Sequence, residues 1–427
     1  MADAQWMVED RLGLFVHFGL YSEAARHEWV MTYEKMTTLQ YERYAKYFDP
    51  DLYDPREWAR AAKAAGMRYV VLTTKHHDGF CLWDSAQTDY TVMNTPFGSD
   101  IVASFVEAFR AEGIRIGLYY SMLDWHHPDF TIDSLHPRSE EPNVDELNAG
   151  RDMERYRRYV RAQLRELLTG YGPIDYMFFD YSYTPETSPE VWGHKGREEW
   201  GSAEIVELVR ELQPNALIND RLDVPGDVVT PEQYQPEDGM TSDGHEVLWE
   251  ACQTLDGSWG YYRDNQAFKT PDLVARMLID GVSKGGNLLF NVGPTARGVI
   301  DDASARLLRE LGEWMRFHSR SIYGAGRSTF APPRDARYTQ RGDRLYLHLF
   351  AWPFGQVHLA GLADRVEYAR FLHDASEVPF EVIPEDANAM NTKMGGLPSG
   401  TLTLALPVRR PDVLVPVVEL FLRTIEE

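Results

Sequence analysis

Cysteine is scarce in this chain. Only two of the 427 residues are cysteines, Cys81 and Cys252. Two cysteines cannot build the disulfide framework of a small secreted domain, and such sparing use is typical of a reducing compartment. We therefore expect a cytoplasmic protein.

Long apolar runs and positive charge are lacking as well. No apolar run approaches the roughly 20 residues of a membrane-spanning helix. The first residues, MADAQWMVEDRLGLF, lack the basic start and apolar core of a signal peptide. The net charge is −23, and a strongly acidic surface repels the phosphates of nucleic acids. The sequence predicts neither a membrane protein nor a nucleic-acid-binding protein.

Apolar residues are plentiful, at 44% of the chain, and they follow a rhythm. Amphipathic stretches at 54–66, 100–113 and 151–172 predict helices, and the first two end at a glycine, a common C-cap. Between such stretches lie short, nearly continuous apolar runs, which are typical of strands in a parallel sheet covered on both faces. These runs are 12–19, 69–74, 114–121, 174–180, 216–220, 246–250 and 287–292. Seven or eight such units predict an α/β fold, a (β/α)8 TIM-like barrel.

The pattern changes after about Gly326. Apolar and polar residues then alternate, turn residues separate the segments, and no long helical pattern intervenes. The alternating segments are 342–352, 356–362, 366–372 and 399–407. This is typical of a small antiparallel β-sandwich. The sequence therefore predicts two domains, a catalytic barrel over 1–330 and a C-terminal β-sandwich over 331–427.

Polar residues follow the apolar runs where each predicted strand ends. In a (β/α)8 barrel these ends share one face, which carries the active site. Each residue alone could be an ordinary core or surface residue, but six strand ends with polar side chains favour a functional site. The residues are His17, His76, His77, Asp78, Tyr119, Tyr120, Ser121, Asp180, Asn219, Asp220, Arg221 and Glu250.

Two chemistries fit such a set. A metal-dependent barrel hydrolase would use His17, His76 and His77 with a carboxylate. However, adjacent residues on a strand point to opposite faces, so His76 and His77 can share a metal only if the strand has already ended. Glycoside hydrolysis needs two carboxyl groups, one at the anomeric carbon and one that protonates the leaving oxygen. Neither a metal nor another cofactor is expected in that case.

Several motifs, in one order along the chain, resemble the α-L-fucosidases of glycoside hydrolase family 29. The similarity extends from about residue 11 to residue 326, and KHHDGF and KGGNLLFNVGP are its most specific blocks. The motifs are LGLFVHFGLYS, FDPDLYDPREWARAAKAAGMRYVVLTTKHHDGFCLWDS, IRIGLYYSMLDW, MFFDYSY, INDR, TPEQ and VSKGGNLLFNVGPTARGVI. The resemblance implies a retaining exo-α-L-fucosidase that removes terminal fucose from fucosylated oligosaccharides.

The resemblance also implies roles for single residues. Asp180 matches the nucleophile at the end of the fourth strand. Phe178 stands where the family usually has tryptophan, so a polar indole contact is lost while the apolar wall remains. The residues that match substrate-binding positions are His17, Glu28, Trp29, His76, His77, Tyr120, Phe178 and Arg221. His126 and His127 match no family role, and we expect them to line the leaving-group side.

The general acid/base is less sharply defined, because its position varies within the family. Glu232, in the segment DVVTPEQYQP, matches the position that many members use. Glu250, at the predicted end of the sixth strand, is the alternative, and Glu28 is a further one. For each of these glutamates, the alternative is a solvated or structural carboxylate without a catalytic role.

Other functions stay open from the sequence. A catalytically inactive fucose-binding protein would keep the pocket without turnover, and a metal-dependent hydrolase would use a similar barrel. The sequence does not say which linkage is cut, nor whether copies of the chain form a homo-oligomer.

Overall fold

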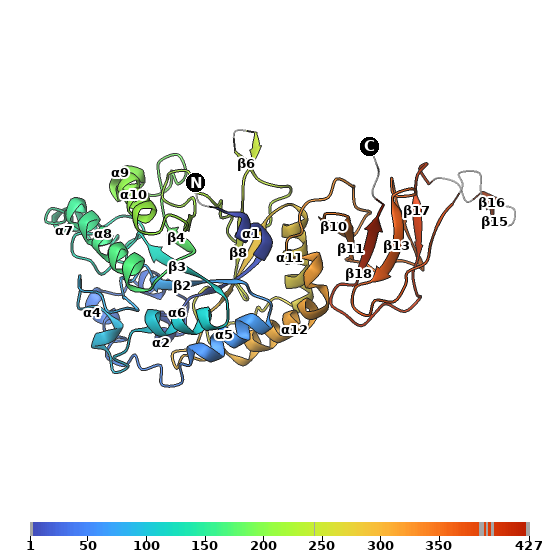
Figure 1. Cartoon of the computed structure of the whole chain (residues 1–427). Helices are drawn as coiled ribbons and strands as arrows, with labels where there is room; N and C mark the ends of the chain where they lie inside the picture. Colours follow the sequence, from blue (N-terminus) through green and yellow to red (C-terminus); the bar gives the residue numbers. More distant parts are fainter. Residues whose placement is uncertain (1–2, 243, 384–387, 390–391, 394–396, 424–427) are drawn as a thin grey trace.

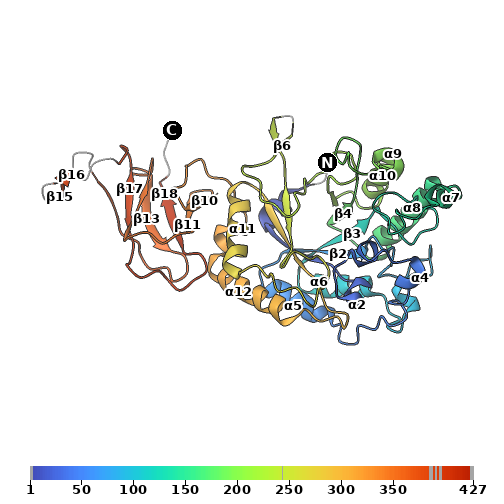
Figure 2. The same cartoon turned by 180° about the vertical axis from the view of Figure 1, so that it is seen from behind.

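The computed structural model describes residues 3–242, 244–383, 388–389, 392–393 and 397–423. One part of the molecule is a curled parallel sheet with helices around it, and the other is a group of antiparallel sheets (Figures 1 and 2). Helices α11 and α12 lie where the two parts meet. Of the helices in the described ranges, none has both the length and the apolar character to cross a membrane.

The parallel sheet has the strand order β5-β4-β3-β2-β1-β9-β8. Strands that follow each other in the first half of the chain lie side by side, and β9 returns to pair with β1, so the sheet curls round on itself. The strands are β1 Leu12–Val16, β2 Tyr69–Lys75, β3 Arg115–Ser121, β4 Tyr176–Asp180, β5 Leu217–Ile218, β8 Glu250–Gln253 and β9 Asn287–Val292. The predicted barrel class is confirmed.

An extended segment, 228–232, lies between the two ends of this sheet. Isolated parallel bridges join Asn219 to Val228 on the β5 side, and Val229 to Trp249 and Glu232 to Cys252 on the β8 side. The segment therefore fills the place between β5 and β8, and on the β8 side four backbone hydrogen bonds join residues 229–233 to residues 248–252. Its sequence has no long apolar run, which is why the strand rhythm misses it.

The helices begin and end where local chemistry dictates. Asp54, Asp100 and Asp152 each cap a helix, because their carboxylates accept hydrogen bonds from backbone N–H groups of its first turn. The three predicted helices are confirmed as α5, α6 and α8. The helices are α1 Gln5–Asp10, α2 Tyr21–Ala24, α3 Val30–Tyr33, α4 Thr38–Tyr41, α5 Pro55–Ala64, α6 Ile101–Ala111, α7 Val144–Asn148, α8 Met153–Gly170, α9 Arg197–Trp200, α10 Ser202–Leu212, α11 Pro271–Ser283 and α12 Asp302–His318, with 3-10 turns Val92–Asn94 and Ser319–Ser321.

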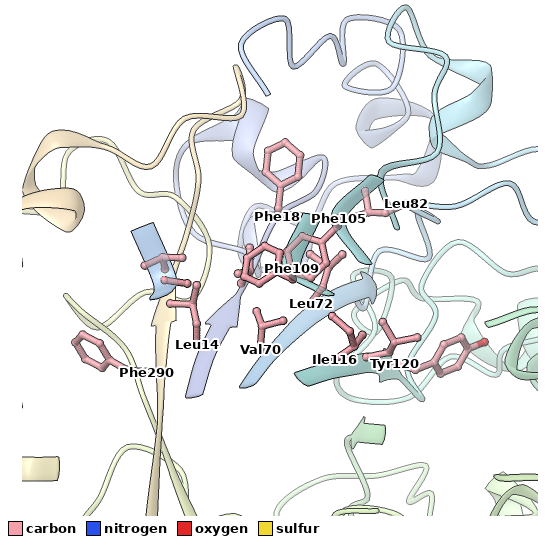
Figure 3. Close-up of a cluster of buried hydrophobic side chains, with 14 of the residues drawn as sticks. Leu14, Phe18, Val70, Leu72, Leu82, Phe105, Phe109, Ile116, Tyr120 and Phe290 are labelled. Atoms are coloured by element: carbon pink, nitrogen blue, oxygen red, sulfur yellow. The ribbon is translucent and has the colours of Figure 1, made fainter. Parts of the chain in front are cut away.

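Alternate residues on the strands pack on opposite sides of the curled sheet. The outward set packs under the helices, and Figure 3 shows part of it, with Val70, Ile116 and Tyr120 together. The inward set forms a separate cluster that includes Phe15, Tyr119 and Phe178. This parity decides which residue of a strand can face a site in the barrel mouth.

The C-terminal part is a β-sandwich. One sheet has the order β10-β11-β18-β13 and the other β12-β17-β14, and their apolar residues form a core of their own. The strands are β10 Ala336–Arg341, β11 Arg344–Leu349, β12 Gln356–Leu359, β13 Val366–Phe371, β14 Phe380–Val382, β17 Leu402–Ala405 and β18 Val417–Leu422; short pairs β6 Thr241–Ser242 with β7 His245–Glu246, and β15 Asn388–Ala389 with β16 Thr392–Lys393, stand apart. The predicted division between residues 330 and 331 stays a prediction; β10 begins a few residues later.

Candidate active site

A cavity of about 340 Å³ opens at the carboxyl ends of the parallel strands. The structure brings to it nine residues that the sequence had marked, although they lie far apart along the chain. These are His17, Trp29, His76, His77, Tyr119, Phe178, Asp180, Arg221 and Glu232. Phe15, Tyr181, Cys252 and Trp259 complete the lining.

Asp180 lies at the centre of this cavity. It is the last residue of β4, on the inward side, and it is only 8% exposed. The Tyr119 hydroxyl donates a hydrogen bond to its Oδ2 over 2.7 Å, and Arg221 Nη1 donates to its Oδ1 over 2.7 Å. The Nε2 of His77 lies 3.9 Å from Oδ2. These contacts fix a carboxylate that points into the cavity.

Arg221 joins two carboxylates. Its Nη1 lies 2.7 Å from Asp180 Oδ1 and 2.7 Å from Glu232 Oε2. A chain of hydrogen bonds holds the guanidinium from behind: its Nε donates to the Thr230 hydroxyl, and that hydroxyl donates to Asp220. Its guanidinium also lies over the Phe178 ring, 5.1 Å from the centroid. The arginine is therefore anchored on three sides, and it sets the spacing of Asp180 and Glu232.

Glu232 is not a residue of a free surface loop. It sits at the end of segment 228–232, where it bridges to Cys252 of β8. Its side chain is 41% exposed, whereas that of Asp180 is 11% exposed. One carboxylate is thus enclosed and the other stands at the mouth of the cavity.

Three histidines line the enclosed end. Burial lowers the pKa of His17 to about 3 and places the pKa of His76 and of His77 well below the usual value. All three imidazoles are therefore neutral at physiological pH, so each can donate one hydrogen bond and accept another. His17 is oriented by Asn291 and His77 by Ser121, each over 2.7 Å. His76 Nδ1 has no hydrogen-bond partner among the described residues.

The lysine and the aspartate beside these histidines point elsewhere. The pairing of β2 with β3 shifts between Thr73 and Lys75, and this irregularity turns Lys75 toward the helices. There Lys75 forms a buried ion pair with Asp124 and donates to the Tyr120 hydroxyl. Asp78 is also buried and accepts from Tyr41. The two outer residues of the Lys75–Asp78 cluster therefore support the turn, and the two histidines face the cavity.

Tyr120 does not line the cavity, and that prediction is wrong. Its hydroxyl donates to Gln163 of α8 on the outward side of β3, and it packs with Ile116 there (Figure 3). The preceding residue, Tyr119, points inward and contacts Asp180. Successive strand residues face opposite sides. An error of one residue along β3 therefore selects the outward-facing tyrosine instead of the inward-facing one.

Glu250 does not lie at the end of a strand, where the sequence analysis placed it. It begins β8 instead of ending a strand, so it lies at the amino-terminal end of the barrel. The hydroxyls of Tyr69 and Tyr176, which stand at the starts of β2 and β4, donate to its carboxyl group. Burial raises its pKa to about 8. Glu250 is a buried group of the barrel floor and is ruled out as the acid/base alternative.

We predict that Glu250→Gln leaves turnover within about twofold of wild type, because glutamine resembles the protonated acid. The folded pKa of about 8 lies above the unfolded value of about 4.3. Wild type therefore loses stability as pH rises between these values, whereas the variant does not. The free energy of unfolding of the variant, relative to wild type, should rise by a few kcal/mol from pH 4.5 to 8.5. Denaturant titrations at both pH values measure it; a constant difference would show an ionised Glu250.

Glu28 is buried and is absent from the cavity lining. Its Oε2 accepts hydrogen bonds from the backbone N–H groups of Trp259 and Gly260. Burial raises its pKa to about 7. In this structure Glu28 holds the loop that presents Trp259 to the cavity, and its contact with a sugar stays a prediction.

His126 and His127 do not line the cavity either, which corrects the expectation for them. His126 stacks on Tyr90 and contacts Glu42, and His127 packs on Tyr156 and Tyr159. Both follow Asp124, which accepts hydrogen bonds from their backbone N–H groups. That turn directs both rings away from the strand ends.

Some lining residues escaped the sequence analysis. Tyr181 follows Asp180 directly but has a left-handed backbone, with φ of 77°. Trp259 lies in a loop without any strand or helix pattern, and it packs on His17 and Phe15. Strand parity could have favoured Tyr119 over Tyr120 as the lining tyrosine; nothing in the sequence around Trp259 marks it. Within the described ranges, no three His, Cys, Asp or Glu side chains are grouped as metal ligands would be.

Comparison with known proteins gives the family. The family model described as alpha-L-fucosidase matches residues 2–320 of this chain. The chain belongs to the α-L-fucosidase family. The family assignment therefore covers all the strands of the barrel.

Relatives of this α-L-fucosidase family member are similar along most of their length. The bovine (Bos taurus) tissue alpha-L-fucosidase is 29% identical over 378 residues, with 82% of this chain and 75% of the relative covered. The plasma alpha-L-fucosidase of Rattus norvegicus is 28% identical over 385 residues, covering 82% and 77%. The resemblance inferred from the motifs is confirmed.

Solved structures share the whole architecture. Alpha-L-fucosidase isoenzyme 1 from Paenibacillus thiaminolyticus superposes with a TM-score of 0.90 at 43% identity, with 99% of each chain covered. A family 29 α-L-fucosidase from Bacteroides thetaiotaomicron has a TM-score of 0.83 at 26% identity, covering 98% of this chain and 96% of its own. That structure is a trapped covalent intermediate with 2-fluoro-fucosyl fluoride in a glutamate-to-glutamine mutant. Barrel and sandwich together are thus an arrangement that this family has.

Proposed function

We propose that the protein is a retaining exo-α-L-fucosidase that releases terminal α-L-fucose from fucosylated oligosaccharides. The observation that carries this is the shared contact of Asp180 and Glu232 with Arg221 at the mouth of an enclosed cavity. Both contacts are 2.7 Å long, so the two carboxylate oxygens lie no further apart than twice that distance. The carboxyl groups of retaining glycosidases are about 5–5.5 Å apart.

In the first step Glu232, in its acid form, gives its proton to the glycosidic oxygen. The bond from the anomeric carbon to that oxygen breaks, and Asp180 forms a bond to the same carbon from the opposite face. The leaving group departs as an alcohol. In the second step Glu232 takes a proton from water, the water oxygen attacks the anomeric carbon, and Asp180 is released. The trapped intermediate of the Bacteroides enzyme supports a covalent route.

The enclosed end of the cavity suits one sugar ring. His17, His76 and His77 are neutral; Asn291 and Ser121 already engage Nδ1 of His17 and of His77, so the Nε2 of each of these two remains for a sugar hydroxyl. Phe15, Trp29, Phe178 and Trp259 give apolar faces for the ring carbons and the methyl group. A closed end of this kind admits a terminal residue and not the middle of a chain, which favours exo action.

An aryl α-L-fucoside tests the proposal against its alternatives. An active enzyme releases the phenol in the presence of a chelator such as EDTA. Binding of fucose without turnover would indicate an inactive fucose-binding protein. Turnover that EDTA abolishes would indicate the metal-dependent hydrolase.

We predict net retention of configuration at the anomeric carbon. The spacing of Asp180 and Glu232 leaves no room for a water between carboxylate and sugar, so two inversions are required. Proton NMR of an aryl α-L-fucoside digest should show α-fucose first, with β-fucose appearing later through mutarotation. If β-fucose is the first product, Asp180 acts as a general base.

A further inference from the structure

A second, open cavity of about 870 Å³ adjoins the sugar cavity. Four residues belong to both: Asp180, Tyr181, Arg221 and Glu232. The remaining wall comes from the chain after β4 and after β5. It consists of Ser182, Thr184, Thr187, Asp220, Asp223 and Thr230.

The proposed reaction places the leaving group in this second cavity. The oxygen that Glu232 protonates belongs to the leaving group, and Glu232 is the half-exposed member of the carboxylate pair. Asp180 attacks from the enclosed side, so the departing group lies on the side that opens to solvent. This inference therefore rests on the proposed function.

Tyr181 forms the wall between the two cavities. Its ring packs edge-on against His77, with centroids 4.9 Å apart, and lies 5.4 Å from Trp29. Its left-handed backbone turns the side chain into this place directly after the nucleophile. An aromatic face at such a junction suits the ring of a second sugar, because sugars present C–H groups to aromatic rings.

Each residue that lines the second cavity carries a hydroxyl or a charged group. Hydroxyl groups come from Ser182, Thr184, Thr187 and Thr230, and no purely aliphatic side chain takes part. Asp180, Asp220, Asp223 and Glu232 contribute four carboxyl groups, and two guanidinium groups oppose them: Arg221 in the lining and Arg197, which pairs with Asp223. The chain as a whole carries −23 charges. The field in this cavity therefore disfavours a further negative charge.

We propose that this cavity is the leaving-group subsite, that it takes an uncharged sugar, and that Asp223 makes it select against leaving groups with a carboxylate or sulfate. Asp220 is unsuitable for testing the charge effect alone, because it accepts a hydrogen bond from Thr230, which in turn holds Arg221. Among the described residues, no hydrogen bond or ion pair joins Asp223 to Arg221, Thr230 or Asp220. Its carboxylate accepts from the backbone and the side chain of Arg197, which is 61% exposed. Arg197 is outside the cavity lining and exposed to solvent, so it offsets the charge of Asp223 only in part.

The test uses two aryl α-L-fucosides that differ in charge, 4-carbamoylphenyl (neutral) and 4-carboxyphenyl (anionic). Asp223→Asn removes the charge and keeps an oxygen for Arg197. Asp343→Asn is the matched control, because Asp343 also pairs with an arginine, Arg344, but in the C-terminal sandwich. The measured quantity is kcat/KM for the neutral substrate divided by kcat/KM for the anionic one. Differences in phenol acidity cancel when variants are compared with wild type.

We expect this ratio to fall about threefold in Asp223→Asn at low ionic strength and to stay constant in Asp343→Asn. Half-molar salt should reduce the difference between wild type and Asp223→Asn. An unchanged ratio in Asp223→Asn, or an equal change in Asp343→Asn, overturns the charge selection. Failure of wild type to hydrolyse even the neutral fucoside would instead refute the proposed fucosidase activity, so the two failures are distinct.

Discussion

Asp180→Ala should fold normally and lose about 10⁴-fold or more in turnover of an aryl α-L-fucoside, because no covalent intermediate can form. Folding is preserved because Arg221, freed from Asp180, keeps its contact with Glu232 and its bonds to Thr230. Stopped assays with a fluorogenic fucoside, together with a thermal unfolding scan, measure both quantities.

Asp175→Ala is the matched control for this prediction. Asp175 immediately precedes β4, and its carboxylate accepts from the backbone of Ile116 at the end remote from the cavity. Its removal should leave kcat/KM near wild type. The nucleophile assignment is wrong if Asp180→Ala keeps more than about a tenth of the activity, since a tenfold loss is only about 1.4 kcal/mol of barrier.

Glu232→Ala should show a loss that depends on the leaving group. A fucoside of an acidic phenol needs little protonation and should still form the covalent intermediate. Hydrolysis of a fucoside with a sugar leaving group should slow by about 10²–10⁴-fold. Azide should then restore turnover, because it needs no general base and fits the space of the missing carboxylate. It attacks the face opposite Asp180, so the product is α-fucosyl azide.

The anomer of the azide separates the two carboxylates. In Asp180→Gly, azide takes the place of the nucleophile and attacks the substrate directly, which gives β-fucosyl azide. Glu250→Gln should give no azide product, because Glu250 is enclosed in the barrel floor. If azide yields the β anomer with Glu232→Ala, the roles of Asp180 and Glu232 must be exchanged.

The sequence was sufficient for the periodic parts of the fold. Helices α5, α6 and α8 carry capping aspartates and an amphipathic face, and the strands before Asp180 and His76 are continuous apolar runs. These are local signals, so they can be read without knowledge of the rest of the chain. The same signals placed Asp180 and the histidine pair at the ends of strands.

The errors arose where a shift of a few residues reverses the result. Tyr119 and Tyr120 differ by one position and face opposite sides of β3. Glu250 begins its strand, and an apolar run before it made it look like the end. Segment 228–232 has no long apolar run, so the sequence does not show that it pairs with residues 248–252. Trp259 depends on contacts with Glu28 from a distant part of the chain. The last two features are set by distant parts of the chain, so local patterns do not reveal them.

Asp180 and Glu232, the proposed nucleophile and acid/base, are held in different ways. Asp180 ends a strand that has neighbours on both sides, and two side chains hold its carboxylate. Glu232 ends a segment joined to β5 and β8 by isolated bridges. Backbone hydrogen bonds between residues 229–233 and 248–252 hold this segment, so the difference lies in the side chains: that of Glu232 is 41% exposed and that of Asp180 is 11% exposed. Asp180 is therefore held in one position, whereas the side chain of Glu232 can turn at the mouth of the cavity, which suits a group that gives a proton in one step and takes one in the next.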